Sequence, residues 1–405
     1  MTVEIRPLSS DDAPTAQRLA EEAFGTPARP TPPPTPQTWP PANAHPWGAW
    51  VDGELVAKAT VRSFTSWFHG ARVPTAGIGG VTVAAEHRGS GLLRPLLDAA
   101  LAEARERGEV VSTLFPSAAG IYRGLGYEIV GAFDEVSIPM SALAAVRRPA
   151  GLRTRRATPT DAPALREVYT AWARGQNGPL TRTEAPFDLG ADDVAGPDAD
   201  YTGVSLAVDP AGEVQGFASW RRGTGYDRST GIEVEDLVAL TPDAARALWA
   251  VLGSFATVTG SVRLCTSGGW SGADPSRLVL PDHATSLVQN QPYMLRLLDL
   301  PGALGAARQA PLSARVPFAV VDATAPDLAG SWTLEVAGTG TRVVPDDGGP
   351  AARPTFTSAG LALSYAGAQS CANLRLAGHL SGPDAHDAVW DAVWAGRQVH
   401  VRDHF

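Results

Sequence analysis

One stretch decides how the first part of this chain folds: Val81-Thr82-Val83-Ala84-Ala85-Glu86-His87-Arg88-Gly89-Ser90-Gly91-Leu92-Leu93-Arg94. An alternating apolar run, typical of a strand, passes through small residues into a segment whose apolar residues recur at helical spacing. We therefore expect a strand, a glycine-containing turn and an amphipathic helix. Such a turn exposes backbone N–H groups at the positive end of a helix dipole, where phosphate binds. Gly89 and Gly91 would let a phosphate approach the backbone closely.

Composition limits the classes of function. The chain has 405 residues, of which 44% are hydrophobic and 19% charged, and its net charge is −9. This length has room for two to four domains of roughly 100–200 residues each. The acidic balance argues against nucleic-acid binding, which needs basic stripes, and is compatible with a cationic substrate.

No sequence feature predicts a membrane or metal partner. No apolar run approaches the ~20 residues that span a bilayer, and Met1–Arg6 lacks the apolar core of a signal peptide. Cys265 and Cys371 lie far apart and show no metal-ligand spacing. We expect a reduced, cytoplasmic protein without a metal.

A short pattern occurs twice. Arg6–Pro14 places Ser and Asp ahead of an apolar helical stripe, and Arg155–Pro163 repeats this arrangement with Thr and Asp. A predicted strand precedes each copy, at Val3–Arg6 and at Leu152–Arg155. The shared register favours an internal duplication.

The second copy differs at its loop. We expect strands at Ser205–Val208, Val214–Arg221 and Glu233–Leu240, followed by a helix over Asp243–Phe255. The loop between the last strand and the helix has no glycine, and Asp243 would face a phosphate. We expect this copy to be a scaffold.

From about Pro301 the pattern changes to short alternating segments between Gly, Pro and Asp turns. A turn or short helix is expected at Leu374–Gly378. This part resembles the sterol-carrier-protein-like α+β fold. The expected strands and helices are Val316–Val321, Ser331–Val336, Arg342–Val344, Thr355–Ser358, Ser358–Tyr365 and Pro383–Trp394.

The glycine loop resembles the coenzyme A site of the GNAT acetyltransferases, whose signature is Arg/Gln-x-x-Gly-x-Gly/Ala. Arg88 and Gly91 match it, and Leu93 departs from its last position. The three parts in this order resemble the bacterial Eis (enhanced intracellular survival) family, most sharply at Ala76–Arg94, at Gly120–Tyr127, at the Leu295–Gly302 junction and at the C-terminal aromatic. The resemblance implies two tandem GNAT-like mixed-sheet domains, a catalytic one at 1–148 and a degenerate one at 149–298, then a sterol-carrier-like α+β domain at 299–405.

The resemblance also implies a cofactor site. Acetyl-CoA would be the co-substrate, and a backbone N–H near Val81 would stabilise the oxyanion. The family's acidic residue at one cofactor contact is replaced here by Ala118. The residues carried over as cofactor contacts are Val81, Thr82, Val83, Arg88, Gly89, Ser90, Gly91, Leu92, Leu93, Arg94, Ser117 and Ala118.

For catalysis, the family match assigns Tyr122 as the general acid, while Tyr127 is expected to pack. The C-terminal carboxylate of Phe405 is the implied base, delivered by a last strand that the alternation of Val399 and Val401 predicts. A chain end without that resemblance is more often frayed. Glu86 and His87 are weaker candidates for the base, since both lie in the phosphate loop.

The acceptor region departs most from the family. Its expected walls are Trp39, Gly80 and His404, and His404 replaces an acidic residue, which weakens cation binding. The segment 28–46 has eight prolines and cannot form a regular helix. Gly79 and Gly80 stand where the family can carry a bulky aromatic. We therefore expect a reshaped acceptor pocket.

Three functions follow from these residues. The first is acetyl-CoA-dependent N-acetylation of primary amines, aminoglycoside-like or polyamine, by direct transfer in a ternary complex. The second is N-acetylation of protein or peptide lysines. The third is a non-catalytic protein that senses coenzyme A or binds lipid. A homohexamer is implied by the resemblance alone.

Overall fold

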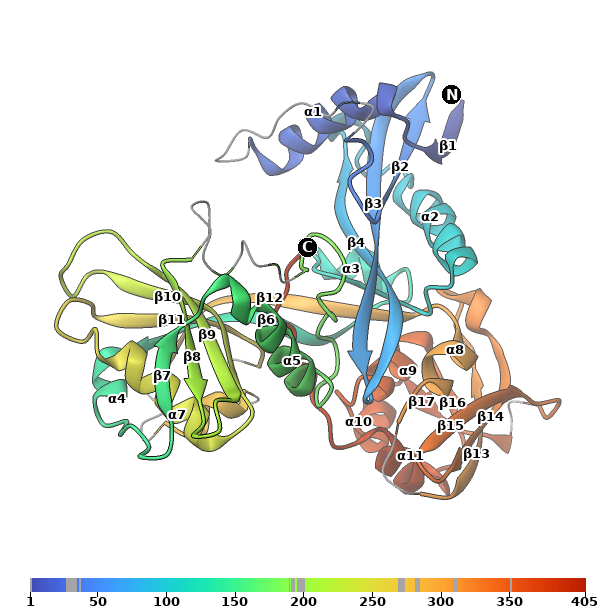
Figure 1. Cartoon of the computed structure of the whole chain (residues 1–405). Helices are drawn as coiled ribbons and strands as arrows, with labels where there is room; N and C mark the ends of the chain where they lie inside the picture. Colours follow the sequence, from blue (N-terminus) through green and yellow to red (C-terminus); the bar gives the residue numbers. More distant parts are fainter. Residues whose placement is uncertain are drawn as a thin grey trace.

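The computed structural model describes residues 2–26, 35, 38–188, 190, 194, 201–268, 274–280, 285–308, 312–349 and 352–405. Residues 28–34, 36 and 37 of the proline-rich segment lie outside this set. Figure 1 shows three parts: the N-terminal part built on β3 and β4, a second part around β8–β11, and a C-terminal part around α9–α11. The end of the chain lies where the first two parts meet.

One mixed sheet of twelve strands runs through the first two parts, in the order β1-β2-β3-β4-β5-β12-β6-β11-β10-β9-β8-β7. In the N-terminal part the strands are β1 Val3–Pro7, β2 Ala44–Val51, β3 Glu54–Phe68, β4 Ala71–Val83, β5 Val111–Leu114 and β6 Glu128–Pro139. In the second part they are β7 Arg153–Arg156, β8 Gly203–Val208, β9 Val214–Arg222, β10 Gly231–Ala239, β11 Ser261–Thr266 and β12 Ser286–Leu297.

The two parts exchange strands. β12 comes from the second part of the sequence, yet it lies antiparallel between β5 and β6 of the first part. β6 in turn pairs along β11, with Ser261 opposite Pro139 and Thr266 opposite Asp134. Each half of the sheet is therefore completed by a strand of the other half, although the predicted domain boundary falls between them.

The predicted duplication is visible at the start of each part. A single 3-10 turn precedes the first helix in both copies, Ser10–Asp12 and Pro159–Asp161. Arg6 Nη1 lies 2.7 Å from Asp12 Oδ2, and Arg155 Nη1 lies 2.7 Å from Asp161 Oδ2. The helices of the two parts are α1 Ala13–Phe24, α2 Leu93–Arg107, α3 Ala119–Arg123, α4 Met140–Ala144, α5 Ala162–Ala173 and α7 Pro242–Gly253.

Helices cover both faces of β3 and β4. The apolar stripe of α2 packs on one face, with Leu96, Leu97 and Ala100 fully buried against Ala59 and Val61 of β3. On the other face α1 contacts β3 and β4. Because side chains alternate along a strand, each residue of β3 and β4 belongs to either the α2 face or the α1 face.

The C-terminal part is an α+β unit, as predicted. Its five strands lie in the order β15-β14-β13-β16-β17. The last helix begins at Asp387, so the predicted start at Pro383 is wrong. The elements are α8 Leu300–Gly305, β13 Ala314–Val320, β14 Gly330–Ala337, β15 Gly340–Pro345, β16 Thr355–Phe356, α9 Ser358–Tyr365, α10 Cys371–Leu376, β17 Leu380–Ser381 and α11 Asp387–Trp394.

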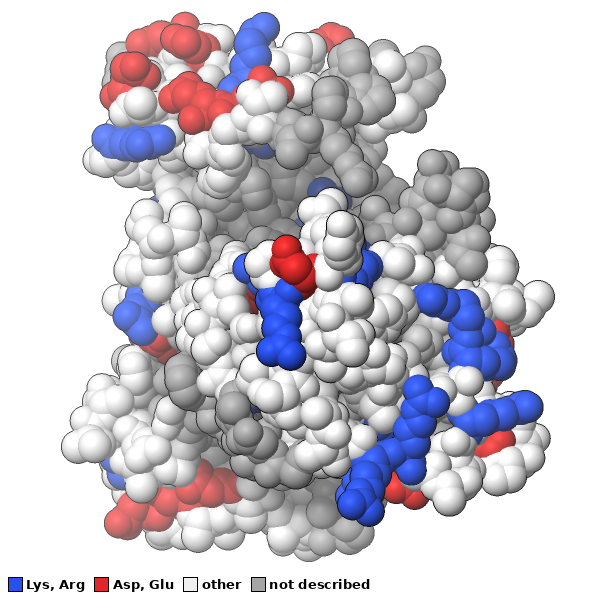
Figure 2. All heavy atoms as spheres, turned by 90° about the vertical axis from the view of Figure 1, so that its left-hand side faces the viewer, with Lys and Arg blue, Asp and Glu red and all other residues white. Residues whose placement is uncertain are grey.

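Charged side chains are unevenly placed on the face shown in Figure 2. Most basic side chains gather at its lower right, and acidic ones gather at its upper left and lower left. Among the residues that the structure describes, no helix combines the length and apolar character needed to cross a membrane.

Candidate active site

The site is organised by a bulge in β4. Lys58 of β3 pairs with Thr82 and Thr60 pairs with Gly79, so Gly80 and Val81 stand together opposite one residue. Gly80 has a φ of +58°, a left-handed conformation that glycine adopts without strain. The bulge redirects the end of β4.

The same point is where two parallel strands separate. β4 pairs with β5 from Thr75 opposite Val111 to Ile78 opposite Leu114, and the pairing ends there while β4 continues to Val83. Beyond Ile78 the edge of β4 that faces β5 is free of strand pairing among the described residues. An extended ligand with amide groups can hydrogen-bond to such an edge in the manner of a strand.

The predicted phosphate loop lies at the end of β4. Gly89 and Gly91 have φ values of +79° and +80°, and a Cβ on either would meet no atom within 4 Å. Leu92 is buried, and α2 begins at Leu93 with no side chain capping its N-terminus. The loop therefore leaves its backbone open, beside uncapped helix N–H groups, as the sequence predicted.

Two arginines fix the ends of this loop. Arg88 Nε donates to the carbonyl of Val83 at 3.3 Å. The Arg94 guanidinium donates to the carbonyl of Gly124, which ties the start of α2 to the end of α3. Ser117 and Ala118 lie exposed on the loop before α3.

Two tyrosines near α3 have different surroundings. The Tyr127 ring is fully buried and its hydroxyl lies 2.7 Å from Ser112 Oγ, where burial raises its pKa to about 12. Tyr122 is buried against the same cluster as α2, and burial raises its pKa as well. Its hydroxyl, however, makes no hydrogen bond to any described residue. A protonated hydroxyl without a structural partner is available to donate a proton.

The Phe405 carboxyl group reaches the bulge from the opposite face. A Cβ on Gly79 would stand 3.6 Å from its carboxyl carbon, and a Cβ on Gly77 would clash with the Phe405 ring at 2.8 Å. The ring also packs on Phe64 and Phe115, at centroid distances of 5.0 and 5.4 Å. Tyr122 lies on the α2 face and the carboxyl group on the other, so the separation of β4 and β5 lies between them.

Residues 399–405, which we call the tail, reach this position without forming the predicted last strand. Val399 makes one bridge with Asn177, and the rest of the tail is irregular. The alternation of Val399 and Val401 misled the prediction because the tail runs between the two parts rather than along a sheet edge. Its backbone is held by Ser267, whose hydroxyl accepts from the Val401 N–H at 2.8 Å.

The tail is anchored in the second part, at the feature equivalent to the bulge. β10 and β11 run parallel, their pairing ends at Val234 opposite Leu264, and β10 has a bulge directly after Val234. Arg402 inserts beyond this point: Nη1 donates to the carbonyl of Cys265 at 2.6 Å and Nη2 to that of Leu237 at 3.4 Å. The separation of strands that is open in the first part is thus filled in the second.

Buried ion pairs hold this anchor. Arg402 Nη2 lies 2.9 Å from Asp274 Oδ2, and both side chains are almost fully buried. Arg182 lies 2.9 Å from Asp403 and 2.6 Å from Asp236. Burial raises the pKa of the Asp274 carboxyl, but Arg402 and its other partners outweigh burial and bring that pKa to about 2.

The predicted acceptor residues lie apart. Trp39 packs at the α1 end, against the cluster that contains Leu19 and Trp50. Gly80 lies in the bulge. His404 stacks on Phe115 with a centroid distance of 4.5 Å. Only Gly80 and His404 thus lie close to Phe405.

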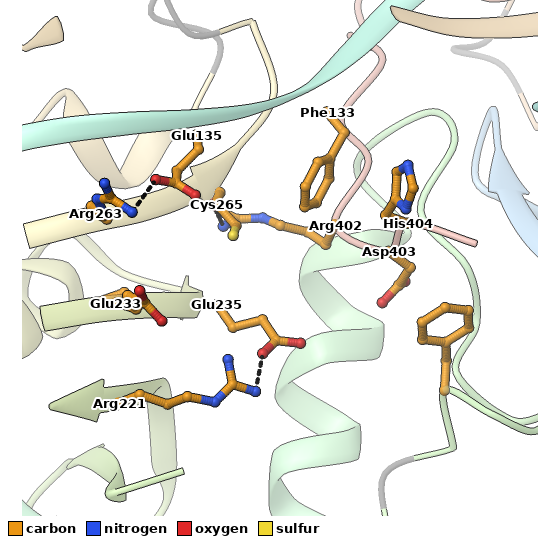
Figure 3. Close-up of a pocket in the computed structure, with 12 residues that line it drawn as sticks. Phe133, Glu135, Arg221, Glu233, Glu235, Arg263, Cys265, Arg402, Asp403 and His404 are labelled. Atoms are coloured by element: carbon orange, nitrogen blue, oxygen red, sulfur yellow. Dashed lines mark hydrogen bonds and ion pairs between the residues drawn. The ribbon is translucent and has the colours of Figure 1, made fainter. Parts of the chain in front are cut away.

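A cavity of about 280 Å³ opens beside His404 (Figure 3). It lies between β6, β9–β11 and the tail, with Phe133 and Phe187 on its walls. Its charged residues include two ion pairs, Glu135 with Arg263 at 3.4 Å and Glu235 with Arg221 at 3.1 Å. Sequence reasoning missed this cavity, because the strand exchange that forms it has no local signal.

Comparisons with known proteins agree with this architecture. Residues 4–130 and 178–297 each match a family model described as an acetyltransferase (GNAT) domain, and residues 300–402 match a sterol carrier protein domain. The chain therefore consists of two GNAT domains followed by a sterol-carrier-like domain.

Similar proteins extend this finding. An uncharacterized N-acetyltransferase of Streptomyces griseus is 34% identical over 285 residues, covering 64% of this chain and 65% of the relative, so the chain spans just under two thirds of that relative's length. A GCN5-related N-acetyltransferase from Kribbella flavida is 29% identical with a TM-score of 0.80, covering 100% of this chain and 98% of the other. Eis1 from Mycobacterium abscessus shares the fold over 100% of both chains, at 24% identity and a TM-score of 0.74.

Proposed function

We propose that this protein is an Eis-like, acetyl-CoA-dependent N-acetyltransferase that uses only its first GNAT domain for catalysis. The observation that carries the proposal is that four features lie around the last residues of β4. These are the end of the β4–β5 pairing, the open glycine loop, the Tyr122 hydroxyl and the Phe405 carboxyl group.

The residues present fit acetyl-CoA. The glycine loop and the uncapped start of α2 would hold its pyrophosphate, because neither Gly89 nor Gly91 has an atom within 4 Å of a Cβ position. The unpaired edge of Val81–Val83 would hydrogen-bond its pantetheine arm. When bound, acetyl-CoA supplies an acetyl thioester.

The base and the acid of the proposed reaction lie on opposite faces of the sheet: the base is the Phe405 carboxylate and the acid is the Tyr122 hydroxyl. The Phe405 carboxylate accepts a proton from the acceptor ammonium, and the freed amine nitrogen then forms the new bond to the acetyl carbon. The N–H at Val81 stabilises the developing oxyanion. The nitrogen releases its second proton to solvent as the carbon–sulfur bond breaks, and Tyr122 donates its proton to the thiolate. Exchange with solvent resets both groups. This is a direct transfer, with no acyl-enzyme.

The acceptor is a primary amine. The resemblance suggests aminoglycosides, polyamines or, as a second candidate, lysine side chains. The test is release of free thiol from acetyl-CoA with an aminoglycoside, spermidine and a lysine peptide. Turnover with any of them supports the proposal. Failure of all three, together with no rise in melting temperature on adding acetyl-CoA, contradicts it.

Three expectations stay predictions: the homohexamer, the cytoplasmic location and the absence of nucleic-acid and membrane partners. The lipid-carrier alternative rests on the sterol-carrier-like domain, whose core around Phe318, Phe356 and Trp390 is filled with packed aromatic rings. A filled core does not favour it.

A further inference from the structure

The only lysine of the chain lies beside the β4 bulge. Lys58 is half-buried on β3, and a Cβ on Gly80 would stand 3.6 Å from its Nζ atom and 3.8 Å from Thr60 Oγ1. The Phe405 carboxyl group lies against Gly79, the residue before Gly80, since a Cβ on Gly79 would stand 3.6 Å from the carboxyl carbon. The ammonium therefore lies at the place where the proposed reaction occurs.

A second cation lies on the same face of β3. Lys58, Thr60 and Arg62 alternate with Ala59 and Val61, which are buried against α2 on the other face. Arg62 is half-buried and pairs in register with Gly77, on which the Phe405 ring packs. Lys58 and Arg62 thus lie on either side of Thr60, the residue of β3 that pairs with Gly79.

Neither cation has a polar partner among the residues that the structure describes. Lys58 and Arg62 make no hydrogen bond and no ion pair with any residue that the structure describes, including the Phe405 carboxyl group. Burial lowers the pKa of both groups, and no acidic neighbour opposes this effect. The Asp403 carboxylate of the tail is engaged by Arg182, and the Glu184 carboxylate accepts hydrogen bonds from Thr65 and Thr181.

Partial burial without a partner is costly for a cation, and most long basic side chains avoid it by extending into water. The charged residues of the cavity in Figure 3 show the contrast, since Glu135 and Arg263, and likewise Glu235 and Arg221, neutralise each other. Among the described residues, the positive charges of Lys58 and Arg62 thus have no ion-pair partner, in a chain whose net charge is −9.

We infer that the acceptor is an amine that also carries an anionic group, a carboxylate or a phosphate, which Lys58 and Arg62 bind while the Phe405 carboxylate receives the reacting amine. This inference rests on the proposed function and narrows its acceptor class. It disfavours acceptors that carry only positive charge, such as aminoglycosides and polyamines, because Lys58 and Arg62 would repel them.

The experiment compares amines that differ by one anionic group: cadaverine with lysine, and glucosamine with glucosamine 6-phosphate. The two pairs also distinguish a carboxylate from a phosphate. We expect kcat/KM for at least one anionic member to exceed that of its partner by about tenfold or more, the value of one charge-assisted contact. The Lys58→Met and Arg62→Met variants should lower this ratio. Arg18→Met, which removes an exposed cation from α1, should not.

Binding provides a second readout that needs no turnover. In the presence of coenzyme A, calorimetric titration with the same four amines should give tighter binding of an anionic member to the wild-type protein than to Lys58→Met. Equal affinity within both pairs would overturn the inference. So would a Lys58→Met variant that loses activity equally on all amines, because this would indicate a role towards the Phe405 carboxylate. The proposed function would survive either result, and it fails only if acetyl-CoA neither reacts nor stabilises the protein.

Discussion

The two GNAT domains begin with the same turn and differ at the groove between their parallel strands. In both, an aspartate accepts hydrogen bonds from an arginine six residues before it and from a backbone N–H three residues before it, the latter at 2.8 Å in each copy. In both, the pairing of the two parallel strands ends near a bulge. Only the first domain then has glycines in the following loop. In the second, Pro242 begins α7 directly and Thr241 caps it.

This contrast supports our proposal that the second domain has the fold without a cofactor site. The side chain of Arg402 occupies the place where the strands of the second domain separate. In the second domain the place where the parallel strands separate thus holds the tail. The following predictions test this division, beginning with the largest expected effect.

Gly91→Glu should abolish productive binding of acetyl-CoA. A side chain there is strained at a φ of +80°, and its charge repels the pyrophosphate. We expect KM for acetyl-CoA to rise by more than about 100-fold, the loss of several hydrogen bonds of ~1 kcal/mol. Gly91→Ala separates strain from charge. Asp243→Asn, at the equivalent loop of the second domain, is the matched control, and a comparable loss there would contradict a scaffold role.

Tyr122→Phe should lower kcat by roughly 10²–10⁴, the usual contribution of a general acid. Tyr127→Phe is the control, since it removes only the 2.7 Å contact with Ser112 and should cost about 1 kcal/mol of stability with little change in kcat. Because burial raises the pKa of Tyr122, the acid stays protonated at neutral pH, and kcat should show no loss from this group until above pH ~10. A near-normal rate for Tyr122→Phe removes it from the mechanism.

Displacing the Phe405 carboxylate should lower kcat by roughly 10²-fold, in the range of a lost general base. Deleting Phe405, or adding one glycine after it, moves the carboxylate away from Gly79. Phe405→Leu keeps the carboxylate and should retain most of the rate. Steady-state kinetics on the three variants decide the point: if the extended chain is as active as the wild type, this group is not the base.

Arg402→Met should weaken the anchor of the tail. It leaves the Asp274 carboxylate buried beside a neutral side chain, which costs about 3–5 kcal/mol in comparable cases. Urea unfolding measures this cost. In the folded variant kcat should fall while KM for acetyl-CoA is unchanged, because the glycine loop is distant from the second domain. Arg397→Met, just before the tail, is the control. A raised KM for acetyl-CoA with an unchanged kcat would contradict this prediction, because it would indicate that Arg402 affects cofactor binding and not the position of the Phe405 carboxylate.

The smallest effect concerns the turn that the two domains share. Asp12→Asn and Asp161→Asn should each cost about 1 kcal/mol, the usual value of a capping interaction. The pKa of Asp12 is lowered to about 2, chiefly by Arg6, and that of Asp161 is lowered by Arg155. A lowered pKa adds stability above pH ~4 that is lost as the pH falls. Thermal unfolding at pH 7 and pH 3 should therefore show both losses shrinking at the lower pH. Unequal losses at pH 7 would break the equivalence of the two turns.

Local features of this molecule were predictable from its sequence, and long-range ones were not. The glycine loop, the turns at Asp12 and Asp161, and α9 depend on residues within a few positions of one another, and each was predicted. The place of β12 between β5 and β6 depends on pairs of residues 149 to 186 positions apart, so no local pattern indicates it.

The candidate site shows the same division. Gly91 and Tyr122 belong to short motifs and were found by resemblance. The position of Lys58 could not be predicted, because nothing near it in the sequence shows that Gly80 lies across from it in a bulge. The ion pair between Arg402 and Asp274 joins residues 128 positions apart, so no local pattern predicts it. Val399 and Val401 alternate like a strand, but their surroundings are set by the packing between domains.

The strand exchange makes the two GNAT domains depend on each other for folding, because β12 of the second domain pairs with β5 and β6 of the first. A chain that stopped near residue 148 would leave β5, whose four residues are all buried, as an unprotected edge with no β12 beside it. Such edges recruit strands from other molecules and aggregate. Loss of the second domain would therefore expose β5 whether or not, as we propose, the chemistry is confined to the first domain. The second domain is thus a structural requirement of the first, because it supplies the strand that covers β5.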